Sequence, residues 1–248
     1  MIISTTPTKT LLQANIKIGS TIIEQCGHNY KNTSIKFLGI MIDDRLSWTD
    51  HITYVKSKLI KIIALISQIK KHFPSHLKIM VFKSLFMPHL LYGIATYGHS
   101  NETKVLFKYQ KWGIRSATNS HIKCHTNSIF AKNNILKFRE LYEHTILLYL
   151  KKTFENIGPA VMNEIFPHKI TRTHIYFTQQ MPTNKKLDKF PNLTFPILWN
   201  SNKFRPIPVL SVTSFGKHVK KIMMERYNYI CKIKQCFNCQ FLNKNYYH

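Results

Sequence analysis

Acidic residues are scarce in this 248-residue chain: 11 Asp or Glu stand against 36 Lys or Arg, a formal net charge of +25. Glycine is also rare, and 44% of the residues are apolar, which excludes a disordered basic tail and predicts a folded core. The five cysteines are odd in number and mostly far apart, so they indicate no disulfide framework and favour a reducing compartment. We expect one large domain, or one domain with a smaller appendage.

Long hydrophobic runs are missing too. The greasiest stretch, residues 79–97, is broken by Lys83, Pro88 and His89, and so falls short of the ~20 apolar residues that a membrane span needs. The first residues do not pair a cationic flank with a long apolar run, as a signal peptide does. We therefore expect an intracellular protein, nuclear or cytoplasmic, that is not secreted and has no membrane partner.

The excess of positive charge predicts a polyanionic partner. A compact protein with this charge repels itself, and nucleic acid relieves the repulsion while releasing its own counterions. The alternative is compositional drift towards lysine, since Lys outnumbers Arg 30 to 6. Drift explains the shortage of acids less well, so nucleic acid is the leading partner class.

The first part of the chain has the patterns of β-strands. Residues 15–18 and 21–24 flank Gly19-Ser20, a connection that suits a tight hairpin. The almost wholly apolar run 35–42 predicts one further strand, covered on both faces.

Helical periodicity follows. Ser47-Trp48-Thr49-Asp50 has the form of a capping box, and the apolar residues behind it are spaced for an amphipathic helix of about six turns. These residues are Ile52, Val55, Leu59, Ile62, Ile66 and Ile69. Pro74 ends this helix, and a second helix over 76–97 should be interrupted at Pro88. Further helices are expected over 102–117, 135–154 and 214–229, with an extended proline-rich connector at 178–208.

The helix over 102–117 carries the clearest candidate binding surface. At about 100° per residue, its cations fall within a strip about 60° wide. They are Lys104, Lys108, Lys111 and Arg115. Val105, Leu106, Tyr109 and Trp112 are expected roughly opposite, towards the core. Solvated faces normally mix charges of both signs, so an acid-free strip favours phosphate contacts, although a solvated face remains the alternative. Tyr97 and Tyr109 would help to stack unpaired bases if they are exposed.

Asp43-Asp44 is a candidate for chemistry, because paired acids at a strand end bind metal ions in polymerases. Such a site needs a third carboxylate, and Glu24 is the only acid upstream. A metal-dependent nuclease would need a distant acid such as Glu102 or Glu140. The alternative is a turn in which the acids stabilise the positive end of the next helix.

The C-terminal tail offers a weak candidate zinc set. Its spacing is C-x4-C-x2-C-x8-H, formed by Cys231, Cys236, Cys239 and His248. The C-x2-C part suits zinc, but the whole set does not match a common pattern. Three free thiols are the alternative.

Several segments together resemble one family. Phe37-Leu38-Gly39, the following Asp43, Leu46-Ser47-Trp48 and His51-Ile52 are similar to the run behind the palm in reverse transcriptases of non-long-terminal-repeat retrotransposons, jockey-like elements especially. Later matches are Phe82-Lys83-Ser84-Leu85, Pro88, Leu91-Tyr92-Gly93, the run 109–115, Leu198-Trp199-Asn200, Phe215 and Lys217. The resemblance implies that Phe37, Leu38 and Gly39 belong to the primer grip and that thumb helices follow.

The resemblance also implies an organisation. The expected fold is α+β and mainly α: a small antiparallel sheet, a thumb-like helical bundle and a basic, partly irregular C-terminal region. We expect the end of the palm at 1–46, a three-helix bundle at 47–120 and an additional helical segment at 121–177. A proline-rich connector at 178–210 and a basic helix with a cysteine-containing tail at 211–248 complete it.

The functional expectation is a C-terminal fragment of an RNA-directed DNA polymerase that grips the primer and template duplex through its backbone. In this family the metal-binding Asp residues precede the segment that Met1 to Ser4 matches. We therefore expect no catalytic residue, no cofactor and no polymerisation by this chain alone, with Mg²⁺ and the missing palm and fingers belonging to the intact enzyme. The alternative is a non-catalytic basic nucleic-acid-binding protein adopted from a retroelement.

Overall fold

The computed structural model describes residues 16–18, 21–23, 34–43, 46–69, 72–170, 175–178, 191–201 and 211–227. These residues are mainly helical and include three two-stranded antiparallel sheets. The expected mainly α fold with small antiparallel pairings is therefore confirmed. One detail is wrong: the strands before residue 47 pair as two separate hairpins, where a single small sheet was expected.

The first hairpin matches the sequence pattern. Strand β1 (Ile16–Ile18) pairs with β2 (Thr21–Ile23), and Ile16 lies opposite Ile23. The predicted hairpin on either side of Gly19-Ser20 is confirmed.

The second hairpin replaces the single strand expected over 35–42. Strand β3 (Ser34–Phe37) turns back into β4 (Ile40–Asp43), and Phe37 lies opposite Ile40. Leu38 and Gly39 form the turn with φ values of 45° and 82°. A two-residue type I′ hairpin turn requires a positive φ at both central residues, and glycine adopts such an angle without steric cost. The run was also expected to be covered on both faces, which is wrong, because Ile35, Phe37 and Leu38 are exposed.

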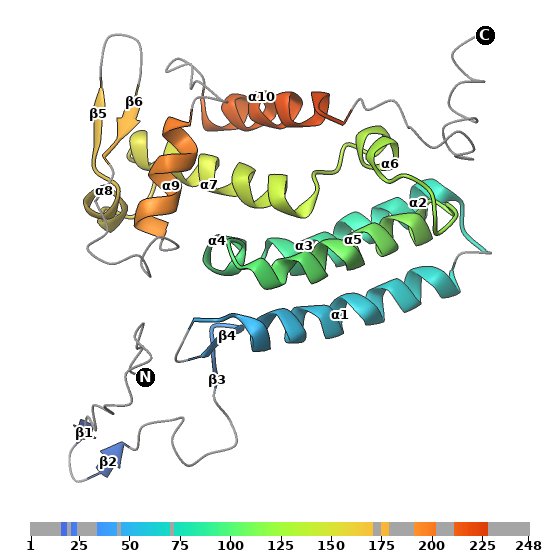
Figure 1. The fold of residues 1–248 in the computed structure, drawn as a ribbon, viewed down its shortest axis with the longest axis horizontal. Helices are drawn as coiled ribbons and strands as arrows, with labels where there is room; N and C mark the ends of the chain where they lie inside the picture. The colour runs from blue at the N-terminus through green and yellow to red at the C-terminus, as the bar shows by residue number, and fades with distance from the viewer. Residues whose placement is uncertain are drawn as a thin grey trace.

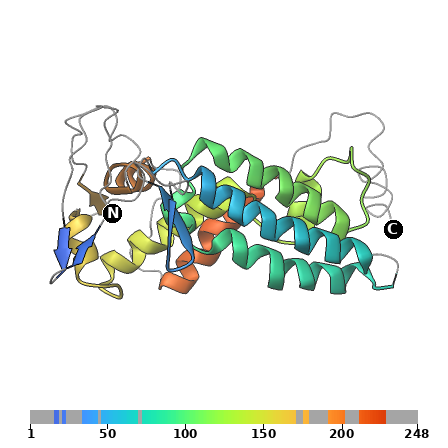
Figure 2. The same cartoon turned by 90° about the horizontal axis from the view of Figure 1, so that it is seen from below.

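Three helical segments pack side by side behind this hairpin (Figures 1 and 2). Helix α1 (Thr49–Gln68) is the first. The second is a composite of α2 (Ser75–Val81), the π-helical turn η1 (Phe82–Phe86) and α3 (Met87–Leu91). Helix α5 (Lys104–Ala117) is the third and follows the 3₁₀ turn η2 (Asn101–Thr103). The core between them contains Leu59, Ile63, Phe82, Phe86, Leu90, Leu106 and Ile114, all fully buried or nearly so.

Helix α1 confirms the helix predicted from apolar spacing, but its start differs from the prediction. The capping box is not formed, because no side chain caps the helix and the N-cap residue Trp48 has φ 65°. Ser47 Oγ instead accepts from the backbone N–H of Thr49, the first residue of α1, at 3.4 Å. The carboxylate of Asp43, on the preceding strand, takes the role of acceptor at this end of the helix.

The expected break at Pro88 is wrong. Proline lacks the N–H that a regular helix needs at this position, and the π-helical turn immediately before it absorbs the mismatch. The second helical segment ends later, at Tyr92 and Gly93. Gly93 has φ 64°, and α4 (Ile94–Tyr97) begins directly after it.

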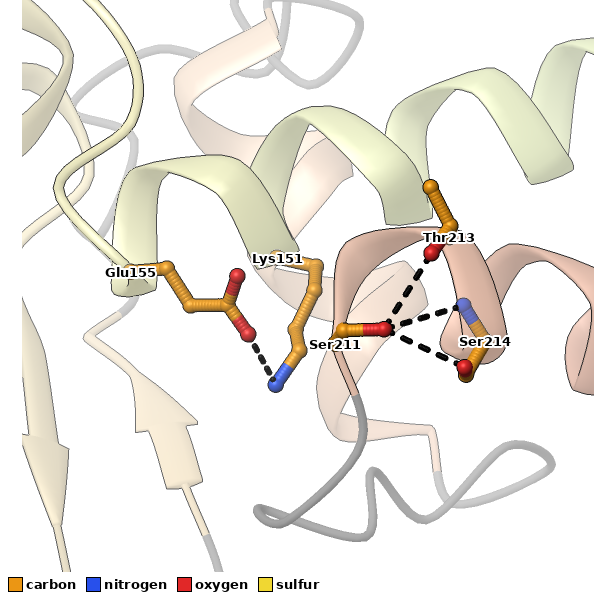
Figure 3. A network of polar contacts seen from close by, with 5 residues as sticks. All are labelled: Lys151, Glu155, Ser211, Thr213 and Ser214. Carbon is orange, nitrogen blue, oxygen red and sulfur yellow. Dashed lines mark hydrogen bonds and ion pairs between the residues drawn. The ribbon is translucent and has the colours of Figure 1, made fainter.

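A second helical layer covers the side of the bundle away from α1 (Figure 1). It consists of α7 (Phe138–Phe154) and α10 (Val212–Glu225), which confirm the helices expected over 135–154 and from 214. In Figure 3, Ser211 caps α10, and its Oγ accepts from the Ser214 backbone N–H at 3.4 Å. Nearby, Lys151 Nζ lies 2.8 Å from Glu155 Oε1 at the end of α7.

The remaining elements are short. They are α6 (Asn127–Lys132), α8 (Val161–Ile165), the hairpin of β5 (His168–Ile170) and β6 (Ile175–Phe177), and α9 (Pro191–Asn200). Helix α9 overturns part of the predicted connector at 178–208. Pro191 occupies its first residue, where the missing N–H costs little, and Phe195 and Trp199 are buried. No helix in the described ranges is long and apolar enough to cross a membrane.

Candidate nucleic-acid interface

The turn between β3 and β4 contains Phe37, Leu38 and Gly39, the three residues that the resemblance assigns to the primer grip. Phe37 and Leu38 are 62% and 74% exposed. Tyr92, just after α3, donates a hydrogen bond from its hydroxyl to the carbonyl oxygen of Leu38. A Cβ on Gly39 would lie 3.2 Å from the Tyr92 ring. The backbone of the turn is thus fixed against the bundle while its apolar side chains remain open to a ligand.

Asp43 serves the turn into α1. Its Oδ2 accepts from the Ser47 backbone N–H at 2.9 Å, and its Oδ1 accepts from the Trp48 backbone N–H at 3.1 Å. Burial raises the pKa of Asp43, but these hydrogen bonds outweigh burial, so the pKa lies below its ordinary value. Both carboxylate oxygens are therefore used at the helix start, as the turn interpretation expected. Asp44 lies outside the described residues.

A metal centre is not formed by the described part of the chain, where no three His, Cys, Asp or Glu side chains gather closely enough to hold an ion. Glu102 is exposed at η2, and Glu140 lies in the first turn of α7. The candidate zinc ligands Cys231, Cys236, Cys239 and His248 all lie outside the described residues.

The cationic strip of α5, defined as Lys104, Lys108, Lys111 and Arg115, lies on the helix as the sequence predicts. Lys104 and Lys108 are exposed. The ammonium of Lys111 lies 4.7 Å from the centroid of the Phe107 ring, in a cation–π contact that leaves the side chain half-buried. Helix α5 contains no acid, so its own residues do not neutralise the strip.

Arg115 differs from the three lysines. Its guanidinium donates to the carbonyl oxygen of Cys124, from Nη2 at 2.8 Å and from Nε at 3.2 Å. Burial lowers the pKa of Arg115, and interaction with Cys124 partly opposes this effect. Arg115 therefore fixes the loop that follows α5, a role that the spacing of the strip did not reveal.

The apolar face of α5 is rotated from the expected one. Leu106 is buried as predicted, together with Gln110, Gly113, Ile114 and Ala117. Val105 and Trp112 were expected in the core but are 37% and 47% exposed. Gly113 explains the rotation, because it faces the second helical segment and a Cβ there would come within 2.8 Å of the Phe82 ring.

Trp112 is a further candidate for this surface, which the sequence pattern had placed in the core. The helical wheel contained the signal, since Trp112 lies about 80° from Lys104 and about 120° from Leu106. Its ring is 6.0 Å from that of the half-buried Tyr109, and the ammonium of Lys56 on α1 lies 6.0 Å from the Tyr109 centroid. Aromatic rings beside lysines are typical of surfaces that stack bases and contact phosphates.

Tyr97 cannot stack bases. It is fully buried, and its hydroxyl donates to the Leu90 carbonyl oxygen at 2.7 Å. Burial raises the pKa of its hydroxyl. Of the two tyrosines considered, only Tyr109 lies at the edge of the exposed surface.

Comparison with known proteins adds no relative: the chain was compared with protein-family models, curated proteins and solved structures, and no match was found in any of the three.

Proposed function

We propose that this chain is the C-terminal part of a reverse transcriptase of the non-long-terminal-repeat, jockey-like class, and that it grips the primer–template duplex. The resemblance suggests the class, and the open side of α5 suggests the grip. Nucleotidyl transfer would belong to the palm portion of such a polymerase and to its Mg²⁺ ions.

The observation that carries the proposal is the acid-free, lysine-rich side of α5. Lys104 and Lys111 are seven residue steps apart, with Lys108 between them, which is about 10 Å along the axis. That length matches about three phosphate steps along one strand of a duplex. Three lysines on one rigid helix can therefore contact successive phosphates without reading the sequence. Arg115 contributes less, because its guanidinium already bonds to Cys124.

A binding experiment tests the grip. A Lys104→Ala/Lys108→Ala/Lys111→Ala variant is compared with the wild type by fluorescence anisotropy on an RNA–DNA duplex over a salt series. Each lost phosphate contact should reduce the salt slope by about 0.9, or about 2.7 for all three. Between 50 and 200 mM salt, the wild type should then lose about 40-fold more affinity than the variant.

The matched control changes three exposed lysines on the other helical layer. Lys152→Ala/Lys217→Ala/Lys221→Ala removes the same charge from α7 and α10. Equal slopes in the two triple variants would contradict the assignment to α5. Competition by heparin as strong as that by duplex would favour the basic binding protein adopted from a retroelement. Nucleotide incorporation by this chain alone, abolished by Asp43→Ala, would contradict the proposal that nucleotidyl transfer belongs to a separate palm portion.

A further inference from the structure

A cavity of about 650 Å³ lies beside the N-terminal end of the cationic strip. Its walls come from three parts of the fold: residues 98–107, the first turns of α7 and the helix α9. The lining residues that matter here are Lys104, Phe107, Lys137, Phe138, Tyr142 and Ile197. The volume is within the range of about 300–1,000 Å³ that is typical of small-molecule sites. This cavity is large enough for one nucleotide.

The charges at the cavity favour an anionic group. Two acids line it, and both have partners inside the protein. Glu143 pairs with Arg139 at 3.2 Å, and Glu140 interacts electrostatically with Lys137, which also lines the cavity. Lys104 also lines the cavity, and within the described residues it takes part in no ion pair. A ligand with one negative group would therefore meet an available cation at Lys104.

The rest of the lining favours a flat, largely apolar body. Phe107, Phe138 and Tyr142 contribute aromatic surface, and Ile197 contributes aliphatic surface. A nucleotide combines these two properties, since its base stacks on aromatic rings and its phosphate pairs with lysine.

The cavity and the cationic strip are continuous. Lys104 belongs to both, and the ammonium of Lys111 lies over the ring of Phe107, which forms part of the wall. A strand that follows the strip towards the start of α5 therefore reaches the cavity. A paired base cannot enter, because it is stacked within the duplex, whereas an unpaired one can.

We infer that this cavity binds one unpaired nucleotide next to the duplex that α5 holds. The inference rests on the proposed grip and specifies its ligand: a duplex with a single-stranded extension, in preference to a blunt one.

Duplexes with a three-nucleotide 5′ or 3′ extension are compared with a blunt duplex of the same sequence. One of the extensions should raise the affinity of the wild type about tenfold, the scale of one stacked base. Ile197→Trp, at a half-exposed position of the wall, should fill the cavity and remove this gain while the affinity for blunt duplex stays unchanged. Ile157→Trp, at an exposed position outside the cavity, is the control and should keep the gain.

A second measurement does not depend on the folding of a variant. With 4-thiothymidine as the first unpaired nucleotide, light should crosslink the wild type within residues 98–107, 137–143 or 194–201. Crosslinks elsewhere, equal affinity for all duplexes, or a gain that survives Ile197→Trp would overturn the inference and leave the grip intact. If blunt duplex binding does not depend on the α5 lysines, the grip itself fails, and crosslinking of a free single strand still tests the cavity.

Discussion

Replacing Asp43 separates its two possible roles, because a carboxylate that holds the turn before α1 and a metal ligand respond differently to Asp43→Ala. Asp43 accepts from the backbone N–H groups of Ser47 and Trp48. Ser47 is exposed, so water can replace the lost bond at little cost. Trp48 is 7% exposed, so the variant would leave its backbone N–H without an acceptor, at a cost of about 1–3 kcal/mol. We expect Asp43→Ala to lower the free energy of unfolding by about 2 kcal/mol.

Urea unfolding followed by tryptophan fluorescence measures this loss. Asp43→Asn keeps an acceptor and should recover about half of it. Asp50→Ala is the matched control, because Asp50 is an exposed acid in the first turn of the same helix, and it should cost less than about 1 kcal/mol. A loss for Asp43→Ala no larger than that for Asp50→Ala would refute the role of Asp43 in holding the turn before α1.

The pH dependence provides a second check on Asp43. Its pKa is lowered in the folded protein relative to the ordinary value of 3.8. The stabilisation should therefore be fully present above about pH 4 and disappear as the pH falls through the folded-state pKa. The difference between wild type and Asp43→Ala should shrink over that acidic range. A difference that stays constant with pH would mean that the charge of the carboxylate is not involved.

Two further changes test the interface. Arg115→Ala removes the hydrogen bond to the Cys124 carbonyl oxygen, so it should lower the free energy of unfolding in urea by about 1–2 kcal/mol. It should also reduce the salt slope of duplex binding less than Lys108→Ala does. An equal reduction of that slope would show that Arg115 also contacts phosphate. Of the three tryptophans, Trp48 and Trp199 are buried and Trp112 is exposed. Nucleic acid should therefore quench the tryptophan fluorescence of the wild type and leave that of Trp112→Phe nearly unchanged. Equal quenching in both proteins would place the ligand away from Trp112.

The spacing of apolar residues predicts the helices well, because the buried face of a helix determines that spacing. The residues at Ile52, Val55 and Leu59 repeat at helical spacing, and all three are buried in α1. The hairpin at 34–43 was not predicted, because its turn consists of Leu38 and Gly39 within an apolar run. Leucine seldom adopts a positive φ, so Gly39 was the only local signal of a reversal. Similarly, the prolines at 191 and 196 suggested a connector, but packing of Phe195 and Trp199 stabilises a helix there.

The candidate site shows the same limit. The positions of Lys104 and Lys108 follow from the helical wheel, because exposed side chains depend only on the helix that carries them. The role of Arg115 depends on a carbonyl oxygen nine residues away in an irregular loop, which no spacing rule contains. The exposure of Trp112 depends on how α5 is rotated in the bundle, and Gly113 and the Phe82 ring set that rotation.

The hairpin turn, the start of α1 and the start of α5 lie at the same end of the helical bundle. Asp43 joins β4 to the start of α1. The Ser100 hydroxyl lies 3.5 Å from the Ser47 carbonyl oxygen, and it also caps η2, immediately before α5. The contacts of Asp43, Ser47 and Ser100 therefore connect the hairpin that contains Leu38 to the start of α5, where Lys104 borders the cavity. A duplex gripped along α5 up to its start would end near the exposed Phe37 and Leu38 and near the cavity walled by Phe107, and unpaired bases need such aromatic and apolar surface more than paired ones do.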